Sequence, residues 1–340
     1  MKLLRSILTA QTPALRSFSR TYAVKPSVPL ISEIRKKTEI SITKAKEALI
    51  ATENNLEKAL AWIEEDLAKS GAKKAAKLAD RVAAEGLIGV ITRNDIPGAS
   101  NGALVELCCE SDFVTRNKIF QQLVRDIAAA ALNIPDNALE VKSGVATIPA
   151  AILNEAKLIE TNVSVKDVIS ETVSKLGENI QLRRAITTRF PSSESASVYT
   201  AASVHGGEAD YGKIGGLVVL HVENDDVTEP GLQLARQLSR HVVGLDPLCL
   251  DSSDAIAKEK QSSLSAPEYQ DFLTSSVLLN QEFLFGQGSV QERLDEFKKN
   301  HGFSLSIKSF TRLVAGEGVD KGLPTDFHSE VMKQIEKSLN

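Results

Sequence analysis

Cysteine, aromatic residues and long apolar runs are all scarce in this 340-residue chain. It has 3 cysteines and no Cys-x-x-Cys pair, so the sequence indicates neither a disulfide framework nor a zinc site. Aromatic residues make up 5%, which predicts cores built from Ala, Leu, Ile and Val. No stretch approaches the ~18 uncharged apolar residues of a membrane span, so we expect no membrane partner. The length is sufficient for two or three domains.

Acidic residues are missing from the first 32 positions, which contain five Lys or Arg together with several Ser and Thr. An Arg-rich, acid-free leader is typical of a mitochondrial transit peptide, so residues 1–24 predict import into the mitochondrial matrix. A disordered basic tail is the alternative. Without those five basic residues the formal net charge changes from −4 to −9. We therefore expect no general nucleic-acid binding, which needs an excess of Lys and Arg.

Signatures of catalysis and of nucleotide binding are missing as well. Residues 207–213 satisfy the pattern G-x-x-x-x-G-K, but Ile214 follows where a phosphate loop needs Ser or Thr, and the segment leads into a strand. Cys108 and Cys109 end an apolar strand with no nearby His, and the five His have no metal-ligand spacing. The sequence thus predicts a protein that is not an enzyme, with no cofactor and no direct nucleotide binding.

The most informative stretch is residues 101–132. The apolar run at 103–109 is typical of a buried strand. Apolar residues then recur at helical spacing, at Phe120, Leu123, Val124, Ile127, Ala128 and Ala131. The loop between strand and helix has Phe113 at its tip, where polar turn residues are usual. The pattern alone favours a Phe113 that folds back onto the core as a staple; the alternative is a side chain that projects into a partner.

Residues 29–66 predict three short helices followed by a connecting helix over 67–85. The candidate N-caps are Ser41 or Thr43 for the second helix and Asn54 or Asn55 for the third. This run resembles the ubiquitin-associated fold, so a ubiquitin-binding adaptor acting through residues 29–66 is an alternative function. The loop at 38–42 lacks the Met-Gly-Phe sequence of ubiquitin binders, which weakens that alternative. Lysines along 69–81 leave RNA binding as a further one.

Later segments predict a second, related unit. Helices are expected at 151–160, 165–176 and 291–300, and strands at 177–187 and 303–311. The alternation along 180–187 predicts one wet face with Gln181, Arg183 and Thr187. Residues 216–226 can be laid over 102–112 at an offset of 114, which indicates an internal duplication. The second copy has Val227 where the first has Phe113.

Residues 109–117 read Cys-Glu-Ser-Asp-Phe-Val-Thr-Arg-Asn and closely resemble the signature of the translation elongation factor Ts family, with Ser111 and Thr115 in place of the usual Thr and Ala. Residues 177–184 resemble the family's Gly-Glu-Asn-Ile-x-hydrophobic-Arg-Arg, and residues 314–321 resemble its Val-Gly-Glu-Gly-Ile-Glu-Lys. Residues 199–207 resemble a lengthened form of its Tyr-x-His-Gly turn, which implies a turn there. This resemblance implies a guanine nucleotide exchange factor that binds mitochondrial elongation factor Tu, disturbs its Mg²⁺ site and stays bound until GTP replaces GDP.

The resemblance also implies an α+β architecture. Its parts are a ubiquitin-associated-like module at 29–66, a duplicated antiparallel sheet-plus-helix core at 86–190 and at 191–246 with 287–322, a helical coiled-coil arm at 247–286 and a C-terminal helix at 323–340. The implied partner-binding residues are Asp112, Phe113, Val114 and Arg116 in the loop, Arg35, Ile42 and Lys46 in the first module, and His205, Asp326 and Phe327.

Overall fold

The computed structural model describes residues 25–38, 40–93, 101–142, 144–190, 198–223 and 228–320. The predicted transit peptide, Val227 and the predicted C-terminal helix with Asp326 and Phe327 lie outside these ranges. The chain divides into two compact units, residues 1–64 and 65–340. Among the described residues, no helix combines the length and the apolar character needed to cross a membrane.

The first unit is built from α1 (Val28–Thr38), α2 (Ile42–Ala51) and the first part of α3 (Leu56–Leu78). The side chain of Ser41 accepts the N–H of Lys44, and that of Asn55 accepts the N–H of Lys58, so each cap satisfies a free donor of its helix. The buried core includes Ile34, Ile40, Ala45, Ala48, Leu49 and Ile63. The three predicted helices are confirmed, whereas their likeness to the ubiquitin-associated fold stays a prediction.

A six-stranded antiparallel sheet forms the first half of the second unit. Strand β1 (Glu85–Arg93) pairs with β2 (Asn101–Cys109) along their full length and forms a hairpin ahead of the Phe113 loop. The order is β3-β4-β5-β2-β1-β7, with β3 at Val141–Lys142, β4 at Val145–Thr147, β5 at Ile180–Thr188 and β7 at Tyr211–Gly212. The core on one face of the sheet includes residues of α5 (Lys118–Leu132), α6 (Ala150–Glu155) and α7 (Val165–Leu176).

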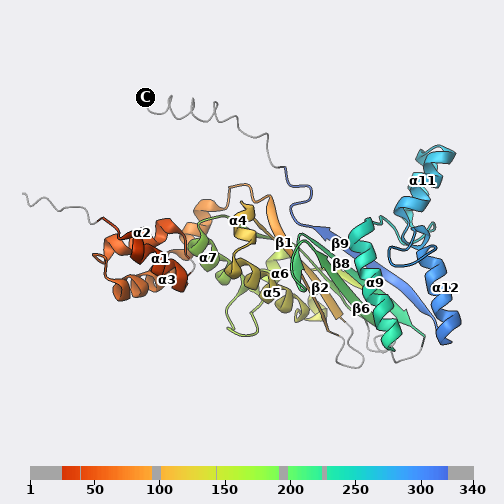
Figure 1. Ribbon diagram of the computed structural model, residues 1–340, viewed down its shortest axis with the longest axis horizontal. Helices are drawn as coiled ribbons and strands as arrows, with labels where there is room; N and C mark the ends of the chain where they lie inside the picture. Colours follow the sequence, from red (N-terminus) through yellow and green to blue (C-terminus); the bar gives the residue numbers. More distant parts are fainter. Residues whose placement is uncertain are drawn as a thin grey trace, which may run out of the picture. The chain divides into compact units, whose positions relative to one another are not determined.

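The second sheet has the order β6-β8-β9, formed by β6 (Val198–His205), β8 (Ile214–Val222) and β9 (Leu305–Val314). Helix α9 (Glu229–Leu245) lies along it in Figure 1, and α12 (Val290–His301) contributes to the same core. The hairpin β6-β8 followed by α9 repeats the arrangement of β1-β2 followed by α5. The antiparallel sheet-and-helix unit is thus present twice, as the sequence pattern predicted.

The two sheets pack on each other through the faces that their helices leave free. Their shared apolar core contains Ile88, Val90 and Leu104 from the six-stranded sheet and Leu217, Val219 and Leu313 from the three-stranded one. The layers are therefore helix, sheet, sheet and helix. A polar side chain buried between the sheets costs free energy unless it finds a hydrogen-bond partner.

Three predictions about individual segments are wrong. Strand β5 exposes Gln181 as predicted, but Thr187, assigned to the same solvated face, is 0% exposed because both sides of the sheet are covered there. Residues 199–205, expected as a turn, belong to β6, and the turn begins at Gly206. Helix α6 ends at Glu155, although helix was predicted to 160.

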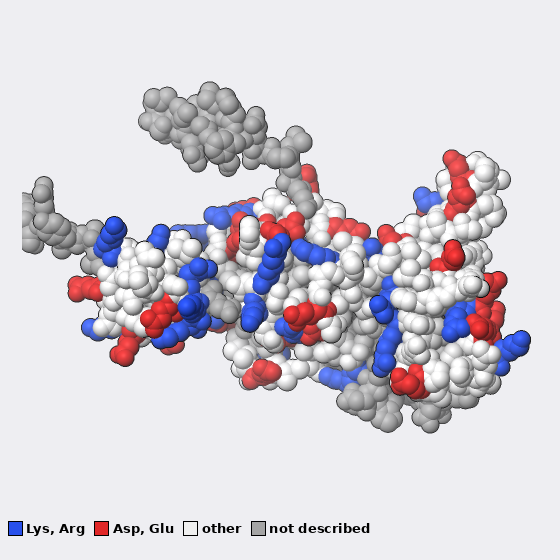
Figure 2. All heavy atoms as spheres, in the orientation of Figure 1, with Lys and Arg blue, Asp and Glu red and all other residues white. Residues whose placement is uncertain are grey.

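Charged side chains of both signs are interspersed on the face drawn in Figure 2.

The predicted arm at 247–286 consists of two short helices, α10 (Ala255–Ser263) and α11 (Ala266–Ser276), followed by the 3-10 turn η2 (Leu278–Asn280). A small core of its own contains Cys249, Ala257, Phe272 and Val277. Ser265 and Glu268 form a capping box that starts α11. The segment is helical in part, and a coiled-coil arm stays a prediction.

Candidate functional site

The loop after β2 presents Phe113 to solvent. It forms a single helical turn, α4 (Asp112–Thr115), in which the Phe113 side chain is 78% exposed and Val114 is 7% exposed. Val114 packs in the core between the sheet and α5. The interpretation of Phe113 as a core staple is therefore wrong: Val114 anchors the turn. Because Val114 is buried, it offers little surface to a partner, in contrast to the role that the family resemblance implied.

Asp112 and Arg116 lie beside Phe113 on the same turn. Their side chains form an ion pair of 2.8 Å and are 48% and 76% exposed. An ion pair this open to solvent contributes at most ~1 kcal/mol to folding. Both charges therefore remain available to a partner at little cost. The structure thus brings three of the four predicted loop residues together at one exposed tip.

The base of this turn is fastened by the start of β5. The backbone N–H of Ser111 donates to Glu178 at 3.0 Å, and the Ser111 hydroxyl donates to the same carboxylate at 2.5 Å. The N–H of Asn179 donates to the Glu110 carboxylate at 2.6 Å. Gly177 ends α7 with φ 79°, the left-handed conformation that lets the chain turn into β5. The Gly-Glu-Asn segment is thus the support of the Phe113 loop.

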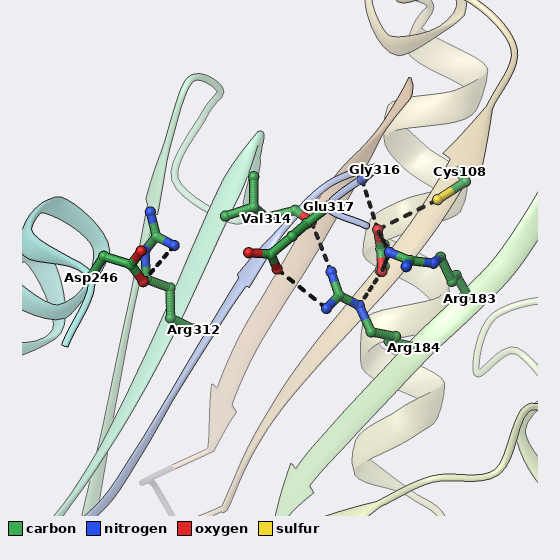
Figure 3. A network of polar contacts seen from close by, with 9 residues as sticks. Cys108, Arg183, Arg184, Asp246, Arg312, Val314, Gly316 and Glu317 are labelled. Carbon is green, nitrogen blue, oxygen red and sulfur yellow. Dashed lines mark hydrogen bonds and ion pairs between the residues drawn. The ribbon is translucent and has the colours of Figure 1, made fainter. Parts of the chain in front are cut away.

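A buried carboxylate joins the remaining motifs through Arg183, Arg184 and Gly316 (Figure 3). This carboxylate belongs to Glu106, which lies in the middle of β2 and is 0% exposed. It accepts hydrogen bonds from Arg183 at 3.0 Å, from the Nε of Arg184, and from the backbone N–H of Gly316 at 2.8 Å. Arg184 also donates to the carbonyl of Val314 at 2.8 Å. A charge buried this deeply requires such a full set of donors.

A register shift in β5 explains how two consecutive arginines reach one carboxylate. The pairing of β2 with β5 jumps from Glu106↔Arg184 to Leu107↔Leu182, so Arg183 is the extra residue of a bulge. In a regular strand the two side chains would point to opposite faces. Gly316 has φ 75°, and a Cβ there would lie 2.1 Å from the carbonyl oxygen of Ala84, so only glycine fits.

The thiols beside this network are not nucleophiles. Burial, followed by the negative charge of Glu106, raises the pKa of Cys108 to about 12, and burial followed by the charge of Glu178 raises that of Cys109 to about 12. Both thiols are therefore protonated near neutral pH, and the nucleophile is the thiolate. Within the described part of the chain, no group of His, Cys, Asp and Glu has a metal-binding arrangement.

The first unit contains a groove of about 600 Å³ that brings together Arg35, Ile42 and Lys46. Ile42 is 49% exposed at its wall. The other lining residues are Val28, Ile31, Ser32 and Lys36, which sequence reasoning did not name. The spacing of Val28, Ile31, Ser32 and Arg35 along α1 is the helical repeat that could have identified this wall. The groove combines cationic side chains with apolar surface.

His205 ends β6 and is exposed, with its carbonyl accepting the N–H of Lys213 at 2.8 Å. It lines a cavity of about 460 Å³ together with Arg240, Arg312, Leu284 and Phe285. The remaining lining residues are Ser203, Val204, Ile214, Val243 and Gly244.

The loop that resembles a phosphate loop has a structural role. Glu208 and Asp210 both pair with Arg125 of α5, at 2.8 Å each. Lys213 pairs with Glu85 at 3.0 Å. Strand β8 follows this loop, whereas a phosphate cradle needs the N-terminus of a helix there. The geometry agrees with the rejection of a nucleotide site at residues 207–213.

Comparison with known proteins identifies the family. Residues 110–317 match the family described as elongation factor TS. The mitochondrial elongation factor Ts of Laccaria bicolor is 34% identical over 93% of this chain and 99% of that protein. Elongation factor Ts of Caulobacter sp. strain K31 is 34% identical over 89% and 96%, and the mitochondrial one of Coprinopsis cinerea is 34% identical over 76% and 84%. This chain belongs to the elongation factor Ts family.

Proposed function

We propose that the chain acts as the guanine nucleotide exchange factor of mitochondrial elongation factor Tu, and that Asp112 and Phe113 enter the GTPase beside its Mg²⁺ site. Membership of the elongation factor Ts family supports nucleotide exchange in translation elongation as the activity. The observation that supports the loop as the active element is the 78% exposure of Phe113 on a turn fastened at its base. An exposed aromatic anchor is the residue type that dominates binding energy at interfaces.

The proposed mechanism is a matter of coupled binding equilibria. GTPases hold GDP through a backbone cradle and a Mg²⁺ ion that bridges phosphate and protein. An exchange factor accelerates release if it binds the nucleotide-free state more tightly than the GDP-bound state. The coupling is reciprocal, so the nucleotide weakens the exchange factor by the same factor. Asp112 and Phe113 supply this difference in affinity between the two states if their binding site on the GTPase exists only when its Mg²⁺ site is displaced. The factor then stays bound until GTP enters.

The second contact proposed is the groove lined by Arg35, Ile42 and Lys46, which would hold the nucleotide-binding domain of the GTPase. Its combination of cationic heads and an exposed Ile42 supports a protein ligand with acidic and apolar groups. His205 would add a contact at the cavity between β6 and α9, and the segment with Asp326 and Phe327 another. In this scheme residues 29–66 act as a ubiquitin-associated-like module, 67–85 as its connection and 247–286 as the arm.

Two observations support a mitochondrial location. Relatives from Laccaria bicolor and Coprinopsis cinerea are named mitochondrial, and the first 32 residues are basic and free of acid. Fusion of residues 1–32 to a fluorescent protein tests the targeting. Matrix fluorescence is expected, and replacement of the basic residues by Gln should abolish it. Cytosolic fluorescence of the unaltered fusion would contradict the location.

The exchange activity is tested by the release of a fluorescent GDP from mitochondrial elongation factor Tu in Mg²⁺, with residues 25–340 of this chain in catalytic amount. We expect acceleration, and Phe113→Ala should reduce it by about 10- to 100-fold, or ~1.4–3 kcal/mol of interface energy. Ile159→Ala is the matched control, since it removes an apolar side chain that is 64% exposed between α6 and α7. No acceleration by the folded protein would overturn the proposal.

A further inference from the structure

We propose that Glu178 is a positioning residue for exchange, which holds the turn of Asp112 and Phe113 in the conformation that presents the aromatic ring. This inference rests on the proposed function of Phe113. The position of a side chain that is 78% exposed is not fixed by packing on its own ring. Its direction must therefore come from the backbone that carries it. That backbone is held by Val114 in the core and, at its start, by Glu178 from outside the loop.

Helix α4 is too short to keep its conformation without contacts to the rest of the protein. It contains four residues, and a helix this short is not stable on its own. Ser111 occupies its N-cap position, with an extended backbone, but its side chain makes no capping hydrogen bond to α4. Both donors of Ser111, the N–H and the hydroxyl, bind Glu178 instead, at 3.0 and 2.5 Å. The residue that normally caps a helix from within is here used to attach the turn to β5.

A carboxylate is the group suited to this attachment. Its two oxygens accept from two donors at once, and the Ser111 N–H and hydroxyl each take a different oxygen of Glu178. A glutamine has one accepting oxygen, and its NH₂ group could bind the Ser111 hydroxyl only if that hydroxyl accepted instead of donating. Either way the negative charge is lost, so both bonds to Ser111 become weaker. Serine and threonine both supply the hydroxyl, which explains why Ser111 can replace the Thr of the family signature.

Asn179 provides a second attachment next to the first. Its N–H binds Glu110 at 2.6 Å, and its side chain donates to the carbonyls of Ala79 and Arg81 at 3.2 and 2.6 Å. Asn179 is buried. The segment after α3, the start of β5 and the residue before Ser111 are thus joined at one point. Glu178 is the member of this set that reaches the turn itself.

The test compares Glu178→Gln, Ser111→Ala and Ser111→Thr in the GDP release assay, with full folding checked by thermal denaturation. Glu178→Gln and Ser111→Ala should lower kcat/KM by about tenfold, the usual effect of one lost charge-assisted hydrogen bond. Ser111→Thr should recover the rate lost in Ser111→Ala, since it restores the hydroxyl. In the Phe113→Ala background, Glu178→Gln should cause no further loss, because it acts through the ring that is already missing.

Hydrogen exchange of the amides of residues 111–116 in the free protein is the second readout, and it does not depend on activity. Glu178→Gln should raise their exchange rates and leave those of β1 unchanged. Unchanged amide exchange, or the same tenfold loss in the Phe113→Ala background, would overturn the positioning role. If wild type is active and Phe113→Ala impaired while Glu178→Gln exchanges GDP normally, this proposal fails and the proposed function stands. If wild type is inactive, the proposed function fails, and with it the role of Glu178 in exchange.

Discussion

Phe113 and Val114 are consecutive residues whose side chains point to opposite sides of the same turn, one 78% and the other 7% exposed. Their substitutions should therefore affect the free energy of unfolding to very different extents. Val114→Ala should lower the free energy of unfolding by about 1–3 kcal/mol, because it leaves a cavity in the core. Phe113→Ala should change it by less than about 0.5 kcal/mol. Urea unfolding measures both, and a destabilised Phe113→Ala would restore the staple interpretation.

Removal of the buried Glu106 carboxylate should destabilise the fold strongly. Glu106→Ala leaves Arg183, Arg184 and the N–H of Gly316 without their acceptor, and we expect a loss of about 3–5 kcal/mol. The matched control is Glu296→Ala in the exposed pair of Arg293 and Glu296 on α12, which should cost less than about 1 kcal/mol. Equal losses in the two variants, measured by denaturant unfolding, would argue against a structural role for the network.

The buried thiols predict a loss of stability in alkali. The pKa of Cys108 and that of Cys109 are raised from 9.0 to about 12, so the folded chain keeps both protons at a pH where the unfolded chain has lost them. The contribution is complete below about pH 9 and is lost as the pH rises toward 12. Urea midpoints between pH 8 and 10.5 should fall less steeply for Cys108→Ala/Cys109→Ala than for wild type. Identical slopes would count against the raised pKa values.

His241 predicts the opposite dependence in acid. Its ring is buried in α9, donates from Nε2 to the amide oxygen of Gln281 at 3.0 Å and accepts the N–H of Leu284 at Nδ1 at 3.2 Å. Burial lowers its pKa below 6.5, so protonation favours the unfolded chain as the pH falls through and below that value. His241→Gln should be less stable at pH 7.5 but should lose less further stability between pH 7 and 5. Unfolding midpoints of wild type and His241→Gln, measured between pH 5 and 7.5, test this prediction.

The groove of the first unit predicts a charge-dependent part of binding. Arg35→Ala/Lys46→Ala should weaken binding to elongation factor Tu by about threefold to tenfold and reduce its dependence on salt, because two cations are removed from the interface. Lys37→Ala is the matched control, since Lys37 pairs with Glu33 on α1 and does not line the groove. A titration at two salt concentrations measures the effect, and equal losses in the two variants would exclude the groove as a specific contact.

Local patterns in the sequence were sufficient for many elements. The helical repeat from Phe120 onward, the caps Ser41 and Asn55, and the glycine that ends α7 each depend on residues within one or two turns. The duplication was visible because both copies repeat the same alternation of strand and helix. The sequence also located the loop of Phe113 through its motif.

What the sequence could not provide depends on contacts between distant residues. The periodicity favoured a buried Phe113, because it could not show that Val114 fills the core position. The bulge at Arg183 changes which residues of β5 share a face, and it is set by pairing with Glu106, 77 positions away. The role of Glu178 depends on Ser111, 67 positions away. The resemblance of residues 199–207 to the family's turn placed the turn too early and concealed β6.

The network of Glu106 also constrains when the protein can complete its fold during synthesis. The N–H of Gly316 lies 210 positions after the carboxylate that it serves. A chain that has emerged as far as β2 therefore has the Glu106 carboxylate but none of these donors. Arg183 and Arg184 follow with β5, and the N–H of Gly316 follows only after β9. Whether the chain emerges N-terminus first from a ribosome or from an import channel, the inner faces of the two sheets can close fully only when nearly the whole chain has emerged.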